Sequence, residues 1–268
     1  MTQNESFKSG FSKVNGLNMY YEIHGEGKPL VLIHGGGSTI ETTFGRIIPL
    51  LAKHRQIIAV ELQAHGHSND RPAELSFEQD ADDVATLLKN IKIVKADFLG
   101  FSNGGQTVIE IALRHPEIVN KIIVASAFYN RSAAVPAFWK GFEGATLDAM
   151  PKVLQEGYLK ANNDEAGLLN MFKKDVQRMK TFKGWSEEQM KTINAPTLII
   201  NANNDVGSME HAVEMCHLVP NCELAIFPGG HGTYLGAIES LDNGHWPEFN
   251  ATKLIEEFLD KLKIIHHF

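Results

Sequence analysis

Short apolar runs alternate with amphipathic helical segments along most of this chain, and this alternation limits the fold more than any other feature. Residues 30–33 form an uninterrupted apolar run, which is typical of a strand buried on both faces. Within 77–91, Val84, Leu87 and Leu88 recur at helical spacing, which predicts an amphipathic helix. Strands separated by helices predict an α/β fold with a mostly parallel sheet and right-handed crossovers.

The same two patterns locate the other elements. Further strands are predicted at 18–25, 56–62, 96–101, 121–128, 196–203 and 222–227, and further helices at 102–115, 209–219 and 251–262. The alternation stops at 130–194, where helical sequence rich in Met and Phe is too long for a plain loop. We therefore expect a core domain made of residues 1–129 and 195–268, with a small helical cap at 130–194 inserted between two strands.

The composition and charge of the chain argue against nucleic acid and membrane partners. The chain has 268 residues, 43% of them hydrophobic, and a formal net charge of -7 without a basic stripe, which argues against nucleic acid. The N-terminal sequence is polar and no apolar stretch approaches the ~18 residues of a membrane span, so neither secretion nor a membrane partner is expected. We expect a cytoplasmic protein that acts on a small molecule, as a monomer or a homodimer. Cys216 and Cys222 match no metal or redox spacing and are expected to be reduced thiols.

A serine lies between glycines where a predicted strand gives way to a helix, in the stretch GFSNGG at residues 100–105. A sharp strand-to-helix turn lifts a hydroxyl above the sheet edge, and glycines avoid clashes in such a turn. A phosphate-binding loop would need a glycine-lysine-serine or -threonine ending, and this stretch has none. Ser102 is therefore the candidate nucleophile, and an ordinary tight turn is the competing interpretation.

A second glycine-rich turn, HGGG at residues 34–37, follows the strand predicted at 30–33. Acyl transfer places negative charge on an oxygen atom, which preorganised backbone N–H groups stabilise, and glycine lets the backbone approach closely. The residue after the nucleophile, Asn103, would supply one N–H, and Gly36 would supply the other, with Gly37 as the alternative. A turn that only bends the chain is the competing interpretation here.

Two residues further along the chain could activate Ser102, because a serine hydroxyl needs an adjacent base that is oriented by an acid. For a nucleophile at such a turn, the expected chain order is serine, acid, histidine. Asp205 and His231 satisfy this order, and each lies just past a predicted strand, where open parallel sheets place functional residues. His245 does not follow a strand, and Asp175 lies in the predicted cap, away from the strand ends.

Together these residues resemble the α/β-hydrolase-fold superfamily, in its serine-nucleophile branch, over nearly the whole chain. The matching motifs are HGGG at 34–37, AHGHS at 64–68, GFSNGG at 100–105, RHP at 114–116, PTL at 196–198, Asp205 and PGGH at 228–231. The resemblance implies an eight-stranded, mostly parallel sheet with helices on both faces and a cap inserted after the sixth strand. It also implies a catalytic triad of Ser102, His231 and Asp205.

The expected function is hydrolysis of a small or medium apolar ester through an acyl-enzyme, without a metal or an organic cofactor. The same triad would serve lactone opening, carbon–carbon bond cleavage or perhydrolysis, and a small-molecule receptor of this fold can retain it. Aromatic residues of the cap should line an apolar pocket that selects the substrate. The candidates for substrate binding are Phe138, Trp139, Phe142 and Phe172.

Overall fold

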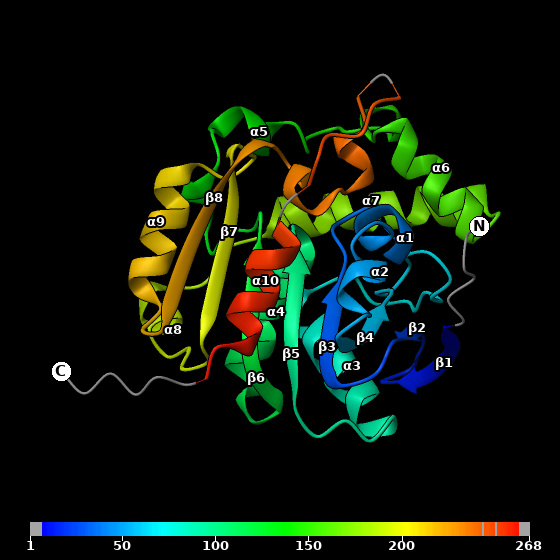
Figure 1. Ribbon diagram of the computed structural model, residues 1–268. Coiled ribbons are helices and arrows are strands. Elements are labelled where there is room, and N and C mark those ends of the chain that lie inside the picture. The colour runs from blue at the N-terminus through cyan, green and yellow to red at the C-terminus, as the bar shows by residue number, and fades with distance from the viewer. Residues whose placement is uncertain (1–6, 243, 250, 263–268) are drawn as a thin grey trace.

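The computed structural model describes residues 7–242, 244–249 and 251–262 and contains one eight-stranded sheet (Figure 1). The strands are β1 (Lys8–Val14), β2 (Leu17–His24), β3 (Lys28–Ile33), β4 (Arg55–Val60), β5 (Ala96–Phe101), β6 (Val119–Ala125), β7 (Thr197–Asn204) and β8 (Cys222–Gly230). Their order in the sheet is β1-β2-β4-β3-β5-β6-β7-β8. β2 pairs antiparallel with β1 and β4, whereas the other neighbouring pairs are parallel. The predicted α/β fold is therefore confirmed.

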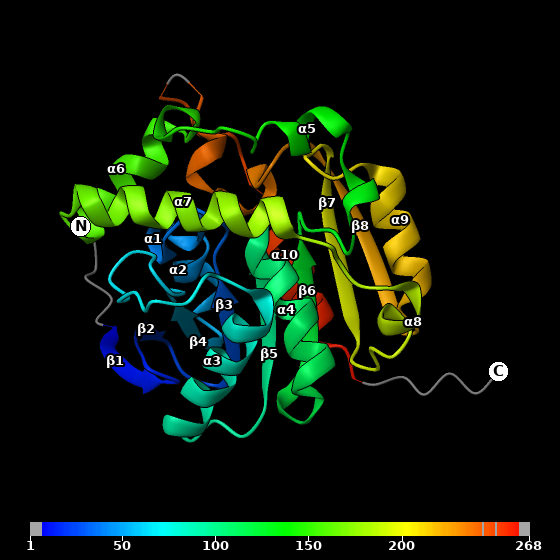
Figure 2. The ribbon, with the colours of Figure 1, turned by 180° about the vertical axis from the view of Figure 1, so that it is seen from behind.

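Helices cover both faces of the sheet (Figures 1 and 2). One face carries α3 (Phe77–Asn90), α4 (Asn103–Arg114) and α9 (Met209–Leu218), and the other carries α1 (Ile40–Phe44), α2 (Ile48–Leu51) and α10 (Ala251–Asp260). Val31 and Ile33 of β3 pack into the first layer, and Leu30 and Leu32 pack into the second. Burial on both faces explains the uninterrupted apolar run of this strand.

Residues 130–194, which were expected to form a cap and are called the cap below, lie between β6 and β7. They contain α5 (Pro136–Lys140), α6 (Lys152–Ala161), α7 (Glu165–Thr181), α8 (Glu187–Met190) and the 3₁₀ helices η2 (Arg131–Ala133) and η3 (Leu147–Ala149). The 3₁₀ helices η1 (Pro116–Ile118), η4 (Thr233–Leu235) and η5 (Ile238–Ser240) lie outside this segment. In Figure 2, α7 runs across the end of the sheet at which the parallel strands finish. Within the described ranges, no helix is long and apolar enough to cross a membrane.

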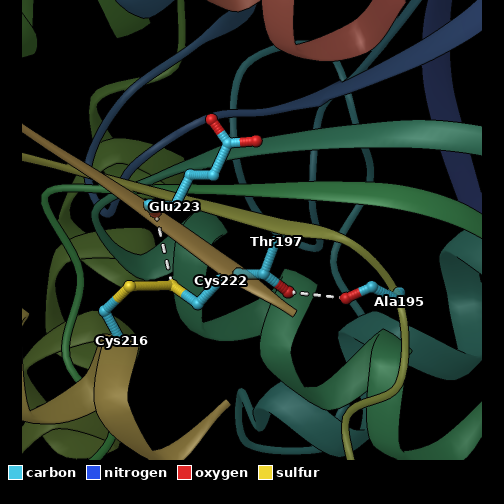
Figure 3. Close-up of a disulfide and its surroundings, with 5 residues drawn as sticks. All are labelled: Ala195, Thr197, Cys216, Cys222 and Glu223. Carbon is cyan, nitrogen blue, oxygen red and sulfur yellow. Dashed lines mark hydrogen bonds between the residues drawn. A yellow bond between two sulfur atoms is a disulfide. The ribbon is translucent and has the colours of Figure 1, made fainter. Parts of the chain in front are cut away.

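Cys216 and Cys222 are joined by a disulfide, so the expectation of two reduced thiols is wrong (Figure 3). Cys216 lies in the last turn of α9 and Cys222 begins β8, and their Cα atoms are 5.4 Å apart. This separation falls within the range that a disulfide spans. The short turn from α9 into β8 brings the two side chains together, and spacing along the sequence does not reveal that turn.

Candidate active site

Ser102 lies at a sharp turn between β5 and α4. Its backbone φ is 54°, in the left-handed region that serine rarely adopts. Its N–H donates to the Ala125 carbonyl of the neighbouring strand β6 at 2.9 Å, which helps to hold this conformation. Strained backbone of this kind persists only where the surroundings hold it, and it is frequent at active sites. The side chain of Ser102 lines a cavity at this end of the sheet.

Two glycines allow this turn to pack tightly against its neighbours. A Cβ atom on Gly100 would lie 2.0 Å from the Gly104 carbonyl oxygen, and a Cβ atom on Gly104 would lie 2.1 Å from the Ile33 carbonyl oxygen. Both contacts are with backbone atoms, which cannot move without shifting a helix or a strand. The close approach of α4 to β3 and β5 therefore requires glycine at both positions.

We expect Gly104→Ala to lower the free energy of unfolding by about 3 kcal/mol, because the added methyl group has no space beside the backbone of β3. Urea unfolding followed by circular dichroism measures this change. Gly10→Ala is the matched control, because its Cβ would have its nearest neighbour 3.6 Å away, and we expect a change below about 0.5 kcal/mol. Equal losses for the two variants would contradict the packing argument.

His231 and Asp205 form the second part of the site. His231 follows β8 and Asp205 follows β7, and the His231 Nδ1 atom lies 2.6 Å from Asp205 Oδ1. Hydrogen bonding to a carboxylate places the proton on Nδ1, which leaves Nε2 as the basic nitrogen. The Phe101 ring packs against the imidazole, with ring centroids 4.6 Å apart. Because Ser102 and His231 line the same cavity, the structure brings together the three residues that the sequence indicated.

Four donors hold the Asp205 carboxylate. Besides the imidazole, it accepts hydrogen bonds from the Val206 N–H (2.8 Å), the Ser126 hydroxyl (2.5 Å) and the Ala202 N–H (3.1 Å). Burial raises the pKa of Asp205, but the hydrogen bonds from His231 and Ser126 lower it by more, so this pKa lies below its ordinary value. Burial lowers the pKa of His231, but Asp205 raises it by more. Asp205 is therefore a carboxylate that stabilises the imidazolium form of His231.

The turn after β3 places backbone N–H groups beside Ser102. The N–H groups of Gly36 and Asn103 have no acceptor within the part of the chain that the structure describes, and both residues line the cavity. The Gly37 N–H donates instead to Asp175 Oδ2 at 2.6 Å. This bond removes Gly37 as the alternative donor to an oxyanion.

A buried ionic cluster, which the sequence did not predict, links the cap to this turn. Arg178 of α7 pairs with Asp175 in the same helix (2.5 Å) and with Asp80 of α3 (2.8 Å). Asp175 also pairs with His65 Nε2 at 2.9 Å. We call Asp80, His65, Asp175 and Arg178 the Asp175 cluster. Two of its members come from α7 and two from the core, so the cluster holds α7 against the turn at Gly37.

The protonation states of two buried histidines follow from their hydrogen bonds. His65 Nδ1 lies 2.8 Å from the Gln63 carbonyl oxygen and its Nε2 lies 2.9 Å from Asp175 Oδ2, an arrangement of two acceptors that favours the doubly protonated ring. Burial lowers the pKa of His65, but Asp175 raises it by more. His34 Nε2 accepts from the Leu62 N–H (3.1 Å), and burial lowers its pKa to about 3. Among the described residues, no group of three or more His, Cys, Asp or Glu could hold a metal ion.

Ser102 and His231 face a cavity of about 360 Å³ between the core and the cap. The cap contributes Phe138, Phe142 and Phe172, three of the four residues that the sequence predicted for substrate binding. Methionine, leucine and valine side chains of the same segment extend this apolar surface. The cavity therefore brings the nucleophile and the base to an apolar binding space.

Trp139, the fourth residue predicted for substrate binding, does not line this cavity. Its ring packs against Phe128 and Phe182, with centroids 5.5 and 6.1 Å apart, and its indole N–H donates to the Arg131 carbonyl at 2.9 Å. Adjacent residues on a short helix point in different directions, so when Phe138 faces the cavity its neighbour Trp139 packs elsewhere. Trp139 is a core residue of the cap.

Comparison with known proteins places the chain among hydrolases. The family described as alpha/beta hydrolase fold matches residues 28–169. The 2-hydroxymuconate semialdehyde hydrolase of Pseudomonas sp. (strain CF600) is 26% identical over 246 residues, which cover 82% of this chain and 86% of the relative. Pyrrolizixenacetamide deacetylase of Xenorhabdus hominickii is 32% identical over 116 residues, but this match spans 43% of this chain and only 44% of the deacetylase.

Solved structures show the same fold. The meta-cleavage product hydrolase of Pseudomonas fluorescens IP01 has a TM-score of 0.74 with this chain and 23% sequence identity. The superposition covers 94% of this chain and 97% of that structure, so the likeness extends over the core and the cap segment. At this level of identity the likeness shows the fold alone.

Proposed function

Because the chain belongs to the alpha/beta hydrolase fold family, we propose that it is a serine hydrolase of small or medium apolar esters. One observation carries the proposal: Ser102 and His231 line a single apolar cavity, and His231 is hydrogen-bonded to the buried carboxylate of Asp205. The N–H groups of Gly36 and Asn103 lie on the same wall. Acyl transfer requires these parts, which are a nucleophile, an oriented base and donors for an oxyanion.

In the proposed mechanism, Ser102 attacks the ester carbonyl while His231 Nε2 takes the hydroxyl proton. Asp205 keeps the proton on Nδ1 and stabilises the imidazolium. The N–H groups of Gly36 and Asn103 bind the oxyanion of the tetrahedral intermediate. The proton then passes to the leaving alcohol, which departs from the acyl-enzyme. Water that His231 activates attacks the acyl group, and the acid leaves Ser102.

The cavity supports an apolar substrate of limited size. Its volume of about 360 Å³ lies near the lower end of the range for small-molecule sites. Phe138, Phe142 and Phe172 offer aromatic surface to an acyl or alkyl chain. We therefore expect short and medium chains to be hydrolysed faster than long chains, because a long chain exceeds the enclosed space.

Carbon–carbon bond hydrolysis with the same triad is a second candidate. It is favoured by the relative named 2-hydroxymuconate semialdehyde hydrolase, whose match covers most of both chains. Against it, the described lining of the cavity contains no Lys or Arg but contains Asp175 and Glu239. Such a wall disfavours an anionic substrate, so we favour an ester without a negative charge.

Two measurements on separate samples test the proposal: fluorophosphonate labelling of one sample, and turnover of p-nitrophenyl esters of graded chain length by an unlabelled sample. We expect Ser102 to be labelled, many turnovers per molecule, and the highest kcat/KM at a short or medium chain. Turnover of 2-hydroxymuconate semialdehyde by the same unlabelled sample tests the second candidate function, carbon–carbon bond hydrolysis. A single slow turnover by the unlabelled protein would indicate a receptor and would contradict the hydrolase.

We expect activity to rise with pH through an inflection above the ordinary imidazole pKa of about 6.5. Only neutral His231 can take the Ser102 proton, and Asp205 raises the pKa of His231, so the active form is lost as the pH falls through this raised value. The pH profile of kcat/KM for a p-nitrophenyl ester measures the inflection. Asp205→Asn should move it to lower pH, because burial remains while the charge is lost. An unmoved inflection would contradict the assignment of Asp205.

A further inference from the structure

Glu239 is a carboxyl group in the cavity that the proposed mechanism does not use. It lies in η5, a short distance along the chain after His231, and it lines the same cavity as Ser102. Its Oε2 atom is buried and has no hydrogen-bond partner among the described residues. Buried polar atoms almost always have a partner, because leaving one unpaired is costly. A bound ligand could supply the missing donor.

The backbone around Glu239 is held in place. The Ser240 N–H and hydroxyl both donate to the Ala237 carbonyl, at 2.9 and 2.6 Å. The Leu241 N–H donates to the Ile238 carbonyl at 3.0 Å. The Ile238 side chain packs against the apolar cluster that α6 and α7 form in the cap. The fold therefore fixes the backbone from which the Glu239 side chain extends at the cavity wall.

The other acid of the cavity wall, Asp175, cannot serve the same purpose. One of its oxygen atoms binds His65 and a backbone N–H, and the other binds Arg178. Within the described ranges, the cavity wall holds no Lys or Arg beside Glu239. Burial raises its pKa, although the charge of His231 and its own backbone N–H lower it. An ammonium group beside Glu239 would favour the charged carboxylate.

We propose that Glu239 accepts a hydrogen bond from a donor group of the substrate, an ammonium or a hydroxyl, and so selects donor-bearing esters over purely apolar ones. This inference rests on the proposed function and narrows its substrate class, because the preferred ester carries one donor group on an otherwise apolar chain. A few polar groups placed in an apolar wall orient a small ligand in this way. The described lining holds no Lys or Arg that could pair with Glu239 in place of the substrate.

Three matched alkylphosphonate probes test the inference, with chains of equal length that end in an ammonium, a hydroxyl or a methyl group. Each probe carries fluoride on phosphorus, so Ser102 Oγ bonds to phosphorus as fluoride departs. No hydrolysis is needed, so the labelling rates report recognition alone. We expect the ammonium probe to label about 10-fold faster than the methyl probe, and the hydroxyl probe about 3-fold faster, because hydrogen bonds between charged groups are the stronger ones. Esters with the same three chain ends should show the same order of kcat/KM.

Two substitutions separate charge from hydrogen bonding. Glu239→Gln keeps an acceptor and loses the charge, so the ammonium preference should fall to about 3-fold, the level of the hydroxyl probe. Glu239→Leu removes the acceptor, so all three probes should label at similar rates. Each ratio compares probes on one variant, so a general change in reactivity cancels. Glu248→Gln, at an exposed acid outside the cavity lining, is the control and should keep the parent ratios.

Equal labelling rates for the three probes in the parent protein would overturn the inference, and so would parent ratios retained by Glu239→Leu. If esters are hydrolysed through Ser102 without a donor preference, the proposed function stands and the role of Glu239 fails. If the probes show the preference but no ester is turned over, the role of Glu239 in recognition stands and the esterase function fails.

Discussion

Ser102→Ala should lower kcat/KM for p-nitrophenyl ester hydrolysis by at least about 10,000-fold. Without the hydroxyl, no acyl-enzyme forms, and the residual rate comes only from the oxyanion donors and from binding. The loss should appear in kcat, because Ser102 forms a bond to the substrate only during the reaction. Steady-state kinetics on the parent and the variant at one pH measures both constants.

This loss should occur without a loss of stability. The left-handed backbone at Ser102 is the same for alanine, which carries the same Cβ, so the strain does not change. We expect the Tm to stay within about 2 °C of the parent value. Ser132→Ala, at an exposed serine of the cap, is the matched control and should keep full activity. Turnover by Ser102→Ala above about one hundredth of the parent rate, at an unchanged Tm, would point to a different nucleophile.

The sequence was sufficient to predict that the proposed nucleophile, base and acid lie close together. A parallel sheet places the carboxyl ends of its strands at one edge, and each of the three residues follows such an end. Ser102 follows β5, Asp205 follows β7 and His231 follows β8, so residues far apart in the chain meet at that edge. The hydrophobic periodicity of each strand and helix predicts where these strands end, so the positions can be found without a structure. Their roles in catalysis stay a prediction until the kinetic experiments are done.

Three features were not predictable from the sequence: strand β1, the Asp175 cluster and the packing of Trp139. No local hydrophobic pattern indicates any of them. The segment of β1 has exposed residues at most positions and lies at the edge of the sheet, so its apolar pattern is weak. In the Asp175 cluster, Asp175 is hydrogen-bonded to His65, which is 110 positions away in the sequence. Arg178 is hydrogen-bonded to Asp80, which is 98 positions away. Only the docking of α7 onto the core brings these charges together. The rotation of α5 likewise decides that Trp139 faces the cap interior.

Arg178→Met should lower the free energy of unfolding by about 3–5 kcal/mol, because it leaves two buried carboxyl groups without the cation that they share. The Arg178 and Asp80 side chains are both 2% exposed, so water cannot replace the lost partner. Burial raises the pKa of Asp80 to about 6 even beside Arg178. Burial also raises the pKa of Asp175, but the charges of His65 and Arg178 hold it well below its ordinary value. Urea unfolding measures the deficit.

The deficit of Arg178→Met should grow as the pH rises from about 5 to about 8. Without the arginine, the folded-state pKa values of Asp80 and Asp175 rise, so the folded variant binds more protons and loses stability at higher pH relative to the parent. Arg114→Met is the matched control, because Arg114 pairs with Asp82 at 2.8 Å with side chains 41% and 34% exposed, and should cost less than about 1 kcal/mol. A deficit no larger than this control, or one that shrinks with rising pH, would show that the Asp175 cluster does not hold α7 to the core.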